Sequence, residues 1–254
     1  MLGVILIEIH VFGNIFFDVL SYGEKVHESD VITMPGGSGF NVAYGLTLIG
    51  YEVYLHSVYG NDELGDYIRN HIKKNTMSDK YINRSDGKTG IFVSHNDRPV
   101  SVRKGLNFNK KINYDDIDFK KCICVLMATE MSKNNRDTIL SKKWFKTFVD
   151  IGPNCDNFIN ADFIIGNENE CINKKCNIIK MGKNGARYDD LHLPGSGREL
   201  PYTIGAGDVF DCAIIDSFIR EEDKHEMLKS AVDISQESCL IPGSSEKMKI
   251  FKSI

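Results

Sequence analysis

The stretch YTIGAGD at residues 202–208, followed by an apolar run, joins three small residues to one carboxylate. We expect it to open a helix, where unpaired N–H groups and the positive end of the helix dipole bind an anion. Gly205, Ala206 and Gly207 let a ligand approach the backbone closely. Asp208 beside that anion can accept a proton from an attacking hydroxyl, as phosphoryl transfer to an alcohol requires. The alternative is a tight turn in which Asp208 only caps the helix.

A second glycine motif, at residues 34–43, also runs from a turn into an apolar helical pattern. Gly36 and Gly37 leave room for a ligand against the backbone, and Asn41 offers both a donor and an acceptor. Taken alone, this motif is typical of any turn at the start of a helix. Together with the first motif it favours a ligand site built from two helix starts.

Strand-like and helix-like segments alternate along the chain, which predicts an α/β fold with a mostly parallel sheet covered on both faces. Two extended, partly polar segments interrupt this alternation and carry turn signals at Asp86-Gly87 and Asn96-Asp97. We expect them to form a small β-sheet lid from residues 19–34 and 87–105, inserted in a single domain that spans residues 1–254. The expected strands are 4–12, 53–58, 122–127, 144–149, 163–165 and 177–180, and the expected helices are 39–49, 63–74, 135–142, 209–220 and 224–239.

The composition is ordinary for a soluble globular protein, with 42% hydrophobic and 26% charged residues. A net charge of −4 gives no reason to expect nucleic acid or a membrane surface as a partner. The apolar N-terminal run lacks a basic start and is interrupted by Glu8, His10 and Asp18, so it predicts a buried strand and a cytoplasmic protein. The seven cysteines form no C-x-x-C pair, and we expect free buried thiols.

Taken with these motifs, the chain resembles the ribokinase (PfkB) family of carbohydrate kinases over nearly its whole length. The family's first signature, G-G-x-x-x-N-x-A, is met by Gly36, Gly37, Asn41 and Ala43. Its second, D-T-x-G-A-G-D, is met at residues 203 and 205–208. Further similarities are the G-x-D-x-x-G turn at 60–65, the N-x-x-E element at 167–170 and the strand and turn at 180–185. The resemblance implies a three-layer α/β/α fold with a β-sheet lid.

The resemblance also implies roles for individual residues, with ATP and Mg²⁺ as cofactors. Asp208 matches the catalytic base, and Gly205, Ala206 and Gly207 match the anion hole for the transferred phosphoryl group. Asn167 and Glu170 match the element that organises Mg²⁺. The sugar side would comprise Asp18, Gly36, Gly37, Asn41 and Glu130, and the nucleotide side Asn167, Lys180, Gly182, Gly185 and Thr203. Arg103 is a further substrate-side candidate because it lies in the expected lid, from which it could reach a phosphate or an acidic sugar.

The second signature departs from the family pattern at two positions. Tyr202 replaces its first Asp, and Ile204 replaces the usual Thr or Asn. Neither side chain is a good oxygen ligand, so these positions argue against activation by a monovalent cation, although backbone carbonyls could still contribute ligands.

These motifs together predict a kinase that moves the γ-phosphoryl group of ATP to a hydroxyl of a small sugar or sugar derivative. A nucleoside kinase with Phe92 or Phe108 stacked on the base, a sugar-acid kinase using Arg103, and a non-catalytic sugar or nucleotide sensor are the alternatives. The exposed edges of the lid suggest a homodimer formed through it.

Overall fold

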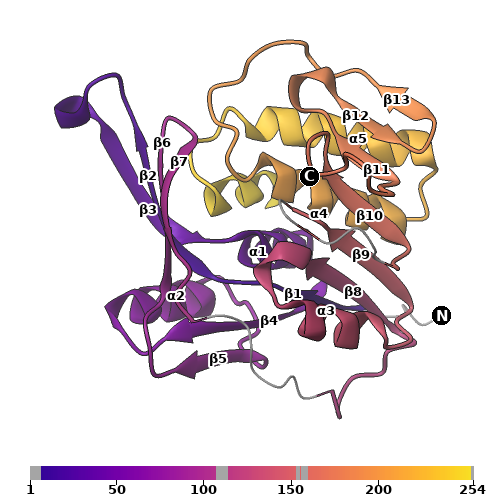
Figure 1. Cartoon of the computed structure of the whole chain (residues 1–254), viewed down its shortest axis with the longest axis horizontal. Helices are drawn as coiled ribbons and strands as arrows, with labels where there is room; N and C mark the ends of the chain where they lie inside the picture. Colours follow the sequence, from indigo (N-terminus) through magenta and orange to yellow (C-terminus); the bar gives the residue numbers. More distant parts are fainter. Residues whose placement is uncertain (1–6, 107–113, 153–154, 156–159, 253–254) are drawn as a thin grey trace.

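A nine-stranded, mostly parallel sheet forms the centre of the protein, whose computed structural model describes residues 7–106, 114–152, 155 and 160–252 (Figure 1). Only the pairings at one edge, β11 with β12 and β12 with β13, are antiparallel. In spatial order the strands are β13 (Leu191–Leu193), β12 (Ala186–Tyr188), β11 (Ile178–Lys180), β10 (Phe163–Asn167), β9 (Lys146–Asp150), β8 (Cys122–Met127), β1 (Glu8–Phe12), β4 (Glu52–Gly60) and β5 (Ile82–Ser85).

Helices cover both faces of this sheet, so its central strands are buried on both sides. Along β8, Ile123 and Val125 join one apolar cluster while Cys124 and Leu126 join the other, as the alternation of side chains in a strand requires. The first cluster lies under α1 (Ser38–Ile49), α2 (Glu63–Lys74), α4 (Ala206–Ile219) and α5 (Lys224–Ser238), and the second lies under α3 (Lys133–Leu140). This is the three-layer α/β/α arrangement that the sequence predicts.

A second sheet of four strands stands apart at one side of the main sheet (Figure 1). Its hairpin turn at Asn96 and Asp97 has positive φ angles of 46° and 59°, as a two-residue turn between twisted strands requires. The middle pair of strands is parallel and the outer pairs are antiparallel. We call this sheet the lid; in spatial order it comprises β3 (Asp30–Gly36), β2 (Phe16–Tyr22), β6 (Gly90–His95) and β7 (Arg98–Arg103).

The lid strands begin and end at slightly different residues from those expected, and this changes the position of one predicted site residue. Asp18 does not lie at the end of the first strand; it lies within β2, paired with Met34 of β3. The chain turns at Gly13 and Asn14 and starts a new strand two residues later. A single apolar run in the sequence therefore conceals two strands that belong to different sheets.

The cysteines are only partly as expected. Cys122, Cys124, Cys212 and Cys239 are buried free thiols, and Cys155 is buried as well. Cys171 and Cys176, by contrast, form a disulfide, so the expectation of free thiols is wrong for this pair. The two residues flank a turn that brings their Cα atoms to 5.8 Å, within the range that a disulfide spans.

Candidate active site

A cleft of about 460 Å³ opens at the carboxyl ends of the parallel strands, the edge at which open α/β sheets bind ligands. Asp150 ends β9, Asn167 ends β10 and Lys180 ends β11, so these three strands deliver polar side chains to one edge. The start of α4 and the end of α5 close the opposite side. The cleft is lined by the predicted residues Glu130, Asn167, Glu170, Lys180, Gly182, Gly185, Thr203, Gly205, Ala206, Gly207 and Asp208.

The turn before α4 presents its backbone to this cleft. Gly205 precedes the first residue of α4 with φ 84°, and a Cβ atom there would lie 2.9 Å from the carbonyl oxygen of Ser244. A side chain at this position would therefore meet both backbone strain and a collision. A Cβ atom on Gly207 would lie 3.4 Å from Nζ of Lys180, which places a positive charge beside the helix start. Both features favour an anion at this turn.

Asp208 is buried in the first turn of α4 and faces the start of α1. Its Oδ2 accepts a hydrogen bond of 2.7 Å from Nδ2 of Asn41, which joins the two glycine motifs across a sequence separation of 167 residues. Burial raises the pKa of Asp208, although the bond from Asn41 and the charge of Lys180 oppose the shift. The helix is capped by Gly205 and not by the Asp208 side chain, so the cap interpretation is wrong. The carboxylate is placed as a proton acceptor would be.

Lys180 lies between two buried carboxyl groups at the floor of the cleft. Its Nζ is 2.5 Å from Oδ2 of Asp150 and 3.2 Å from each carboxylate oxygen of Asp211. Burial disfavours the ammonium, but these carboxylates more than offset that effect and raise the pKa of Lys180 above its usual value. The ammonium is therefore permanently charged and fixed in direction, close to the turn at Gly205–Gly207.

Buried polar side chains gather around the start of α1; Asp18 and Asn41 belong to this group and do not line the cleft. Asp18 is 2% exposed, and its Oδ2 accepts a bond of 2.5 Å from Oγ of Ser244. A Cβ atom on Gly36 would lie 1.9 Å from this Oδ2, so only glycine fits beside the carboxylate. Burial raises the pKa of Asp18 to about 7, and the charge of Asp208 contributes. Among the described residues nothing donates to three buried acceptors here, which are Oδ1 of Asn14, Asp18 and Asn41.

Glu130 lies in a short helical turn after β8 and binds backbone N–H groups. Oε2 accepts bonds of 2.7 Å from the amide of Asn14 and 3.2 Å from that of Gly39, and Oε1 accepts one of 3.1 Å from Ser38. Desolvation, with a contribution from Asp208, raises the pKa of Glu130 to about 8 against these bonds. The carboxyl group thus fixes the N-terminus of α1 while it also lines the cleft.

Asn167 and Glu170 form a reciprocal pair after β10. Oδ1 of Asn167 accepts a bond of 3.0 Å from the Glu170 amide, and Oε2 of Glu170 accepts one of 2.8 Å from the Asn167 amide. Each side chain is thereby held toward the cleft and keeps further lone pairs. Such an oxygen pair suits a hydrated Mg²⁺ ion, which needs few protein ligands.

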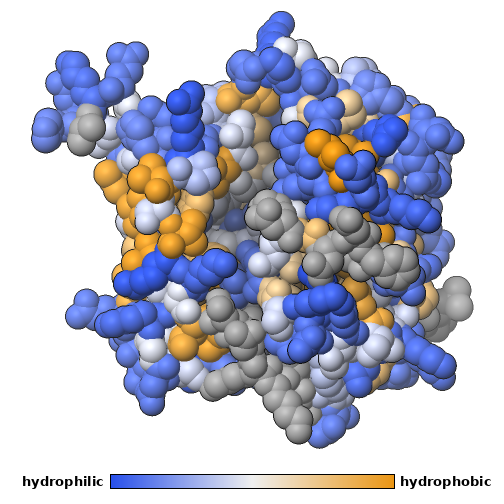
Figure 2. Space-filling model, viewed as in Figure 1, coloured by the Kyte–Doolittle hydropathy of each residue, from blue (hydrophilic) through white to orange (hydrophobic). Residues whose placement is uncertain are grey.

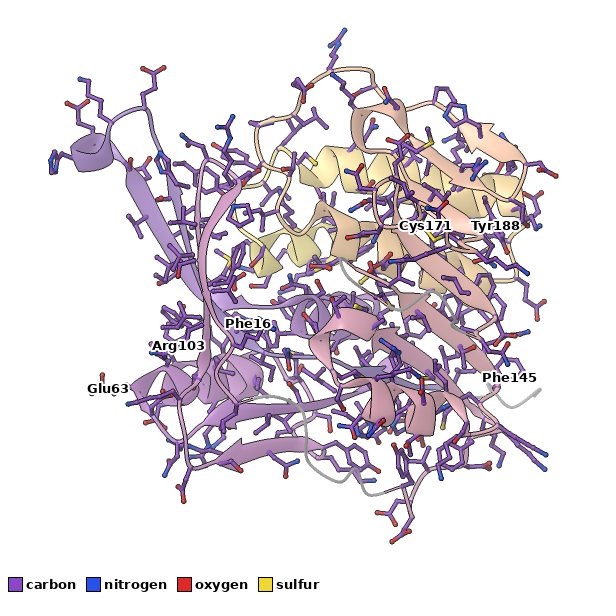
Figure 3. The ribbon with its side chains drawn as sticks, in the orientation of Figure 1. Phe16, Glu63, Arg103, Phe145, Cys171 and Tyr188 are labelled. Carbon is purple, nitrogen blue, oxygen red and sulfur yellow. A yellow bond between two sulfur atoms is a disulfide. The ribbon has the colours of Figure 1, made fainter. Side chains whose placement is uncertain are left out.

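One predicted residue lies elsewhere. Arg103 is on the exposed strand β7, donates to the carbonyl oxygen of Thr89 at 2.9 Å, and lies on the α2 side of the lid near Glu63 (Figure 3). The structure does not bring Arg103 to the other substrate-side residues. Phe92 is half-buried within β6, where it is the register partner of Asp18, and Phe108 lies outside the described residues.

The hairpin tip of the lid contacts the second signature. Oδ2 of Asp97 accepts a bond of 3.0 Å from Oγ1 of Thr203 and also contacts the Thr203 amide. Oδ1 of Asp97 accepts a bond of 3.1 Å from the hydroxyl of Tyr22. The lid is thus joined directly to the residues that precede the anion-binding turn.

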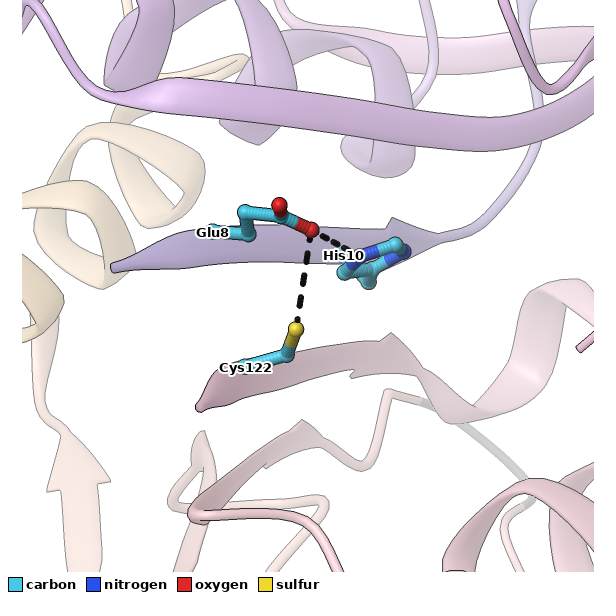
Figure 4. A group of neighbouring side chains, drawn as sticks. All are labelled: Glu8, His10 and Cys122. Atoms are coloured by element: carbon cyan, nitrogen blue, oxygen red, sulfur yellow. Dashed lines mark hydrogen bonds and ion pairs between the residues drawn. The ribbon is translucent and has the colours of Figure 1, made fainter. Parts of the chain in front are cut away.

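A separate group of candidate metal ligands lies at the other end of the strands (Figure 4). Oε2 of Glu8 is 3.4 Å from Nε2 of His10 and 3.7 Å from Sγ of Cys122. Nδ1 of His10 is 2.8 Å from Nε2 of His56. Protons on the thiol and the imidazoles complete this chain of hydrogen bonds, so the group is satisfied as a polar network.

Sequence reasoning missed Asn14, Asp150, Asp211 and Ser244 as site residues. Asp211 carries a signal in retrospect, because it follows Asp208 by one helical turn and must share its face. Asp150 follows a predicted strand, as the carboxyl-end rule would suggest. Ser244 carries no local signal, since its role depends on contacts with distant Asp18 and Gly205.

Comparison with known proteins places the chain in a family. Residues 7–134, half of the chain, match the model of the pfkB family carbohydrate kinases. The chain belongs to this family. It is 24% identical over 248 residues to the ribokinase of Bacillus subtilis, covering 82% of each chain. It is 22% identical over 281 residues to the deoxyribokinase of Salmonella typhimurium, covering 89% of this chain and 90% of that one.

The fold of this pfkB family member is also found among solved ribokinase structures. Arabidopsis thaliana ribokinase, solved with ribose and ATP, superposes with a TM-score of 0.79 at 17% identity and covers 96% of this chain and 98% of its own. The family match makes the protein a carbohydrate kinase by class, as the sequence predicts. In the described part of the chain, none of the helices combines the length and the apolar character needed to cross a bilayer.

Proposed function

We propose that this carbohydrate kinase transfers the γ-phosphoryl group of ATP to a hydroxyl of a small sugar or sugar derivative, with Asp208 as the base. The observation that carries the proposal is the position of the Asp208 carboxylate. It is buried between the turn at Gly205–Gly207 and the polar pocket at the start of α1. A hydroxyl in that pocket can give its proton to Asp208 while the turn stabilises charge on the transferred group. The raised pKa strengthens the carboxylate as a base.

The polar pocket supports a polyhydroxylated acceptor. The unpartnered Oδ1 atoms of Asn14, Asn41 and ionised Asp18 accept hydrogen bonds, and sugar hydroxyls are the matching donors. A substrate that lacks these hydroxyls would leave buried acceptors without partners, which a site of this kind rejects strongly. The ribokinase and deoxyribokinase relatives support an acceptor of similar size.

The remaining part of the cleft supports ATP as the donor. Lys183 lines it from within the turn at Gly182–Gly185, together with Arg198 and Gln236, and the end of α5 supplies Val232 and Cys239 as an apolar wall. Asn167 and Glu170 would hold a hydrated Mg²⁺ ion, whose charge neutralises the donor phosphates. The floor suits such an ion, since the carboxyl groups of Asp150 and Asp208 outnumber the Lys180 ammonium there. The residues therefore fit both cofactors.

A panel assay tests this proposal. The purified protein is incubated with ATP and Mg²⁺ against pentoses, hexoses, fructosamines, sugar acids and nucleosides, and ADP release is measured. Turnover with a sugar or sugar derivative is expected. Turnover with nucleosides alone would support the nucleoside kinase instead. Ligand-induced thermal stabilisation without turnover would support the sensor.

We also propose a homodimer formed through the lid. The edge strands β3 and β7 carry exposed apolar side chains, and Figure 2 shows such side chains gathered over the lid. Val31 is 62% exposed, Val100 64% and Val102 51%. Unpaired edges with apolar faces favour pairing with a second chain. Sedimentation of wild type and Val100→Lys tests this, and a wild-type monomer would refute it.

A further inference from the structure

Lys247 is a lysine with no exposed surface, in the helical segment η4 (Ser245–Lys252). Its Nζ donates to the carbonyl oxygens of Tyr202 at 2.9 Å, Ser238 at 2.8 Å and Ile241 at 2.5 Å. An ammonium group has three N–H donors, so each of them finds a backbone oxygen. Burial lowers the pKa of Lys247 to about 8, which still leaves the group charged at neutral pH.

These carbonyls belong to segments that position the proposed anion hole. Tyr202 lies three residues before Gly205, and its amide donates to the carbonyl oxygen of Cys239 at 3.1 Å. The same ammonium thus joins the approach to α4 with the end of α5. The segment before η4 also packs against Gly205 through Ser244. The position of the Gly205–Gly207 turn therefore depends on a contact that lies outside the cleft.

A cage of backbone carbonyl oxygens around one positive charge is the environment that also binds a desolvated potassium ion. Ile204 offers no side-chain oxygen for such an ion and Tyr202 offers only a poor phenolic ligand, as the sequence already indicates. We propose that Lys247 is a positioning residue for phosphoryl transfer, its ammonium acting as a built-in monovalent cation that fixes the Tyr202 carbonyl and, through it, the anion-binding turn. This inference rests on the proposed function.

Two consequences follow for the reaction. The wild-type rate should not respond to K⁺, because the cage is already filled. Replacing Lys247 by methionine removes the ammonium and leaves three inward-facing carbonyl oxygens without their cation. The Gly205–Gly207 turn should then shift from its working position. A small misplacement of such a turn affects the transition state more than substrate binding, and kcat should fall ~100-fold with little change in KM.

The test measures kcat and KM of wild type and Lys247→Met in choline chloride, NaCl, KCl and NH₄Cl at constant ionic strength. We expect K⁺ or NH₄⁺ to raise the kcat of the variant at least ~10-fold and to reach saturation as its concentration increases. The kcat of wild type should not change. Lys249→Met is the matched control, since its ammonium lies at the surface in an ion pair with Glu246. Activation of wild type by K⁺, or a variant whose kcat is unchanged or insensitive to every cation, would overturn the proposal.

A second readout does not depend on turnover. Thermal unfolding of Lys247→Met should occur at a higher temperature in KCl than in choline chloride, while wild type and Lys249→Met show no such difference. If wild type phosphorylates no acceptor, the proposed function fails. The thermal comparison still tests whether a monovalent cation can replace the Lys247 ammonium among the three carbonyl oxygens. If Lys247→Met refolds in KCl but not in choline chloride, the proposal is supported. Failure to refold in both salts would overturn it.

Discussion

Replacing Asp208 by asparagine should change stability and activity in opposite directions. Burial raises the pKa of this carboxyl group, so its ionised form is disfavoured in the folded protein by 1.36 kcal/mol for each unit of the shift. Asparagine keeps an acceptor for the 2.7 Å bond from Asn41 and carries no charge. The free energy of unfolding should therefore stay constant or rise by up to ~2 kcal/mol, which for a chain of this length raises Tm by ~2–4 °C per kcal/mol.

The same substitution removes the proposed base, so kcat should fall by ~10²–10⁴ with KM for the acceptor nearly unchanged. ADP release gives the kinetic constants, and a thermal scan of the same preparations gives Tm. Asp216→Asn is the matched control, because Asp216 lies on the same helix, binds Tyr51 and Arg220, and is not part of the cleft. A kcat within a factor of ~3 of wild type would refute the role of Asp208 as base. A clear fall in Tm would instead assign its carboxylate a structural role.

Further predictions concern the floor of the cleft and the sugar pocket. Lys180→Met leaves Asp150 and Asp211 without their cation, so the free energy of unfolding in urea should fall by ~3–5 kcal/mol. Lys183→Met, which removes an exposed pair with Glu199, should cost under ~1 kcal/mol, and equal losses would contradict the argument. The pKa of Asp18 is raised from 3.8 to about 7, so its contribution to stability is full below pH 3.8 and is lost as pH rises through 7. That loss amounts to ~4 kcal/mol, and urea unfolding at several pH values should show it in wild type but not in Asp18→Asn; parallel profiles would rule it out. Gly36→Ala places a Cβ atom 1.9 Å from Asp18, so KM for the sugar should rise more than ~10-fold while KM for ATP is unchanged, and an unaltered sugar KM would exclude this close contact.

Elements with strong local signals could be predicted from the sequence. The helix at Glu63–Lys74 was expected at the bounds that the structure shows. Asp62 caps it through a bond of 3.0 Å from the Gly65 amide, and Ile68 and Ile72 face the core at helical spacing. The two glycine motifs were likewise predictable, since each combines a turn signal with an apolar helical pattern. The hydrogen bond between Asn41 and Asp208 that joins them was not among the expectations, because nothing in the spacing of the motifs indicates it.

Residues that act through distant contacts could not be predicted. Lys247 lies in a polar segment that is typical of an exposed surface, and only the convergence of three separate carbonyls makes its burial favourable. Arg103 is a different case, since its charge suggested a ligand contact while its guanidinium donates to the carbonyl oxygen of Thr89 in the structure. The short strands β12 and β13 have three residues each, too few for a periodic signal.

The bond between Asp18 and Ser244 has a consequence for the synthesis of the protein. The two residues are separated by 226 positions, so the sugar pocket cannot be completed until Ser244 has been translated. At ~5–20 residues per second, the ribosome needs ~10–45 s to pass from one to the other. Until Ser244 is made, Asp18 lacks its hydroxyl donor. Gly205, once it has been translated, lacks the backbone that packs behind it. We therefore expect kinase activity to appear only with chains that extend past Ser244, even though the first signature is made at the start.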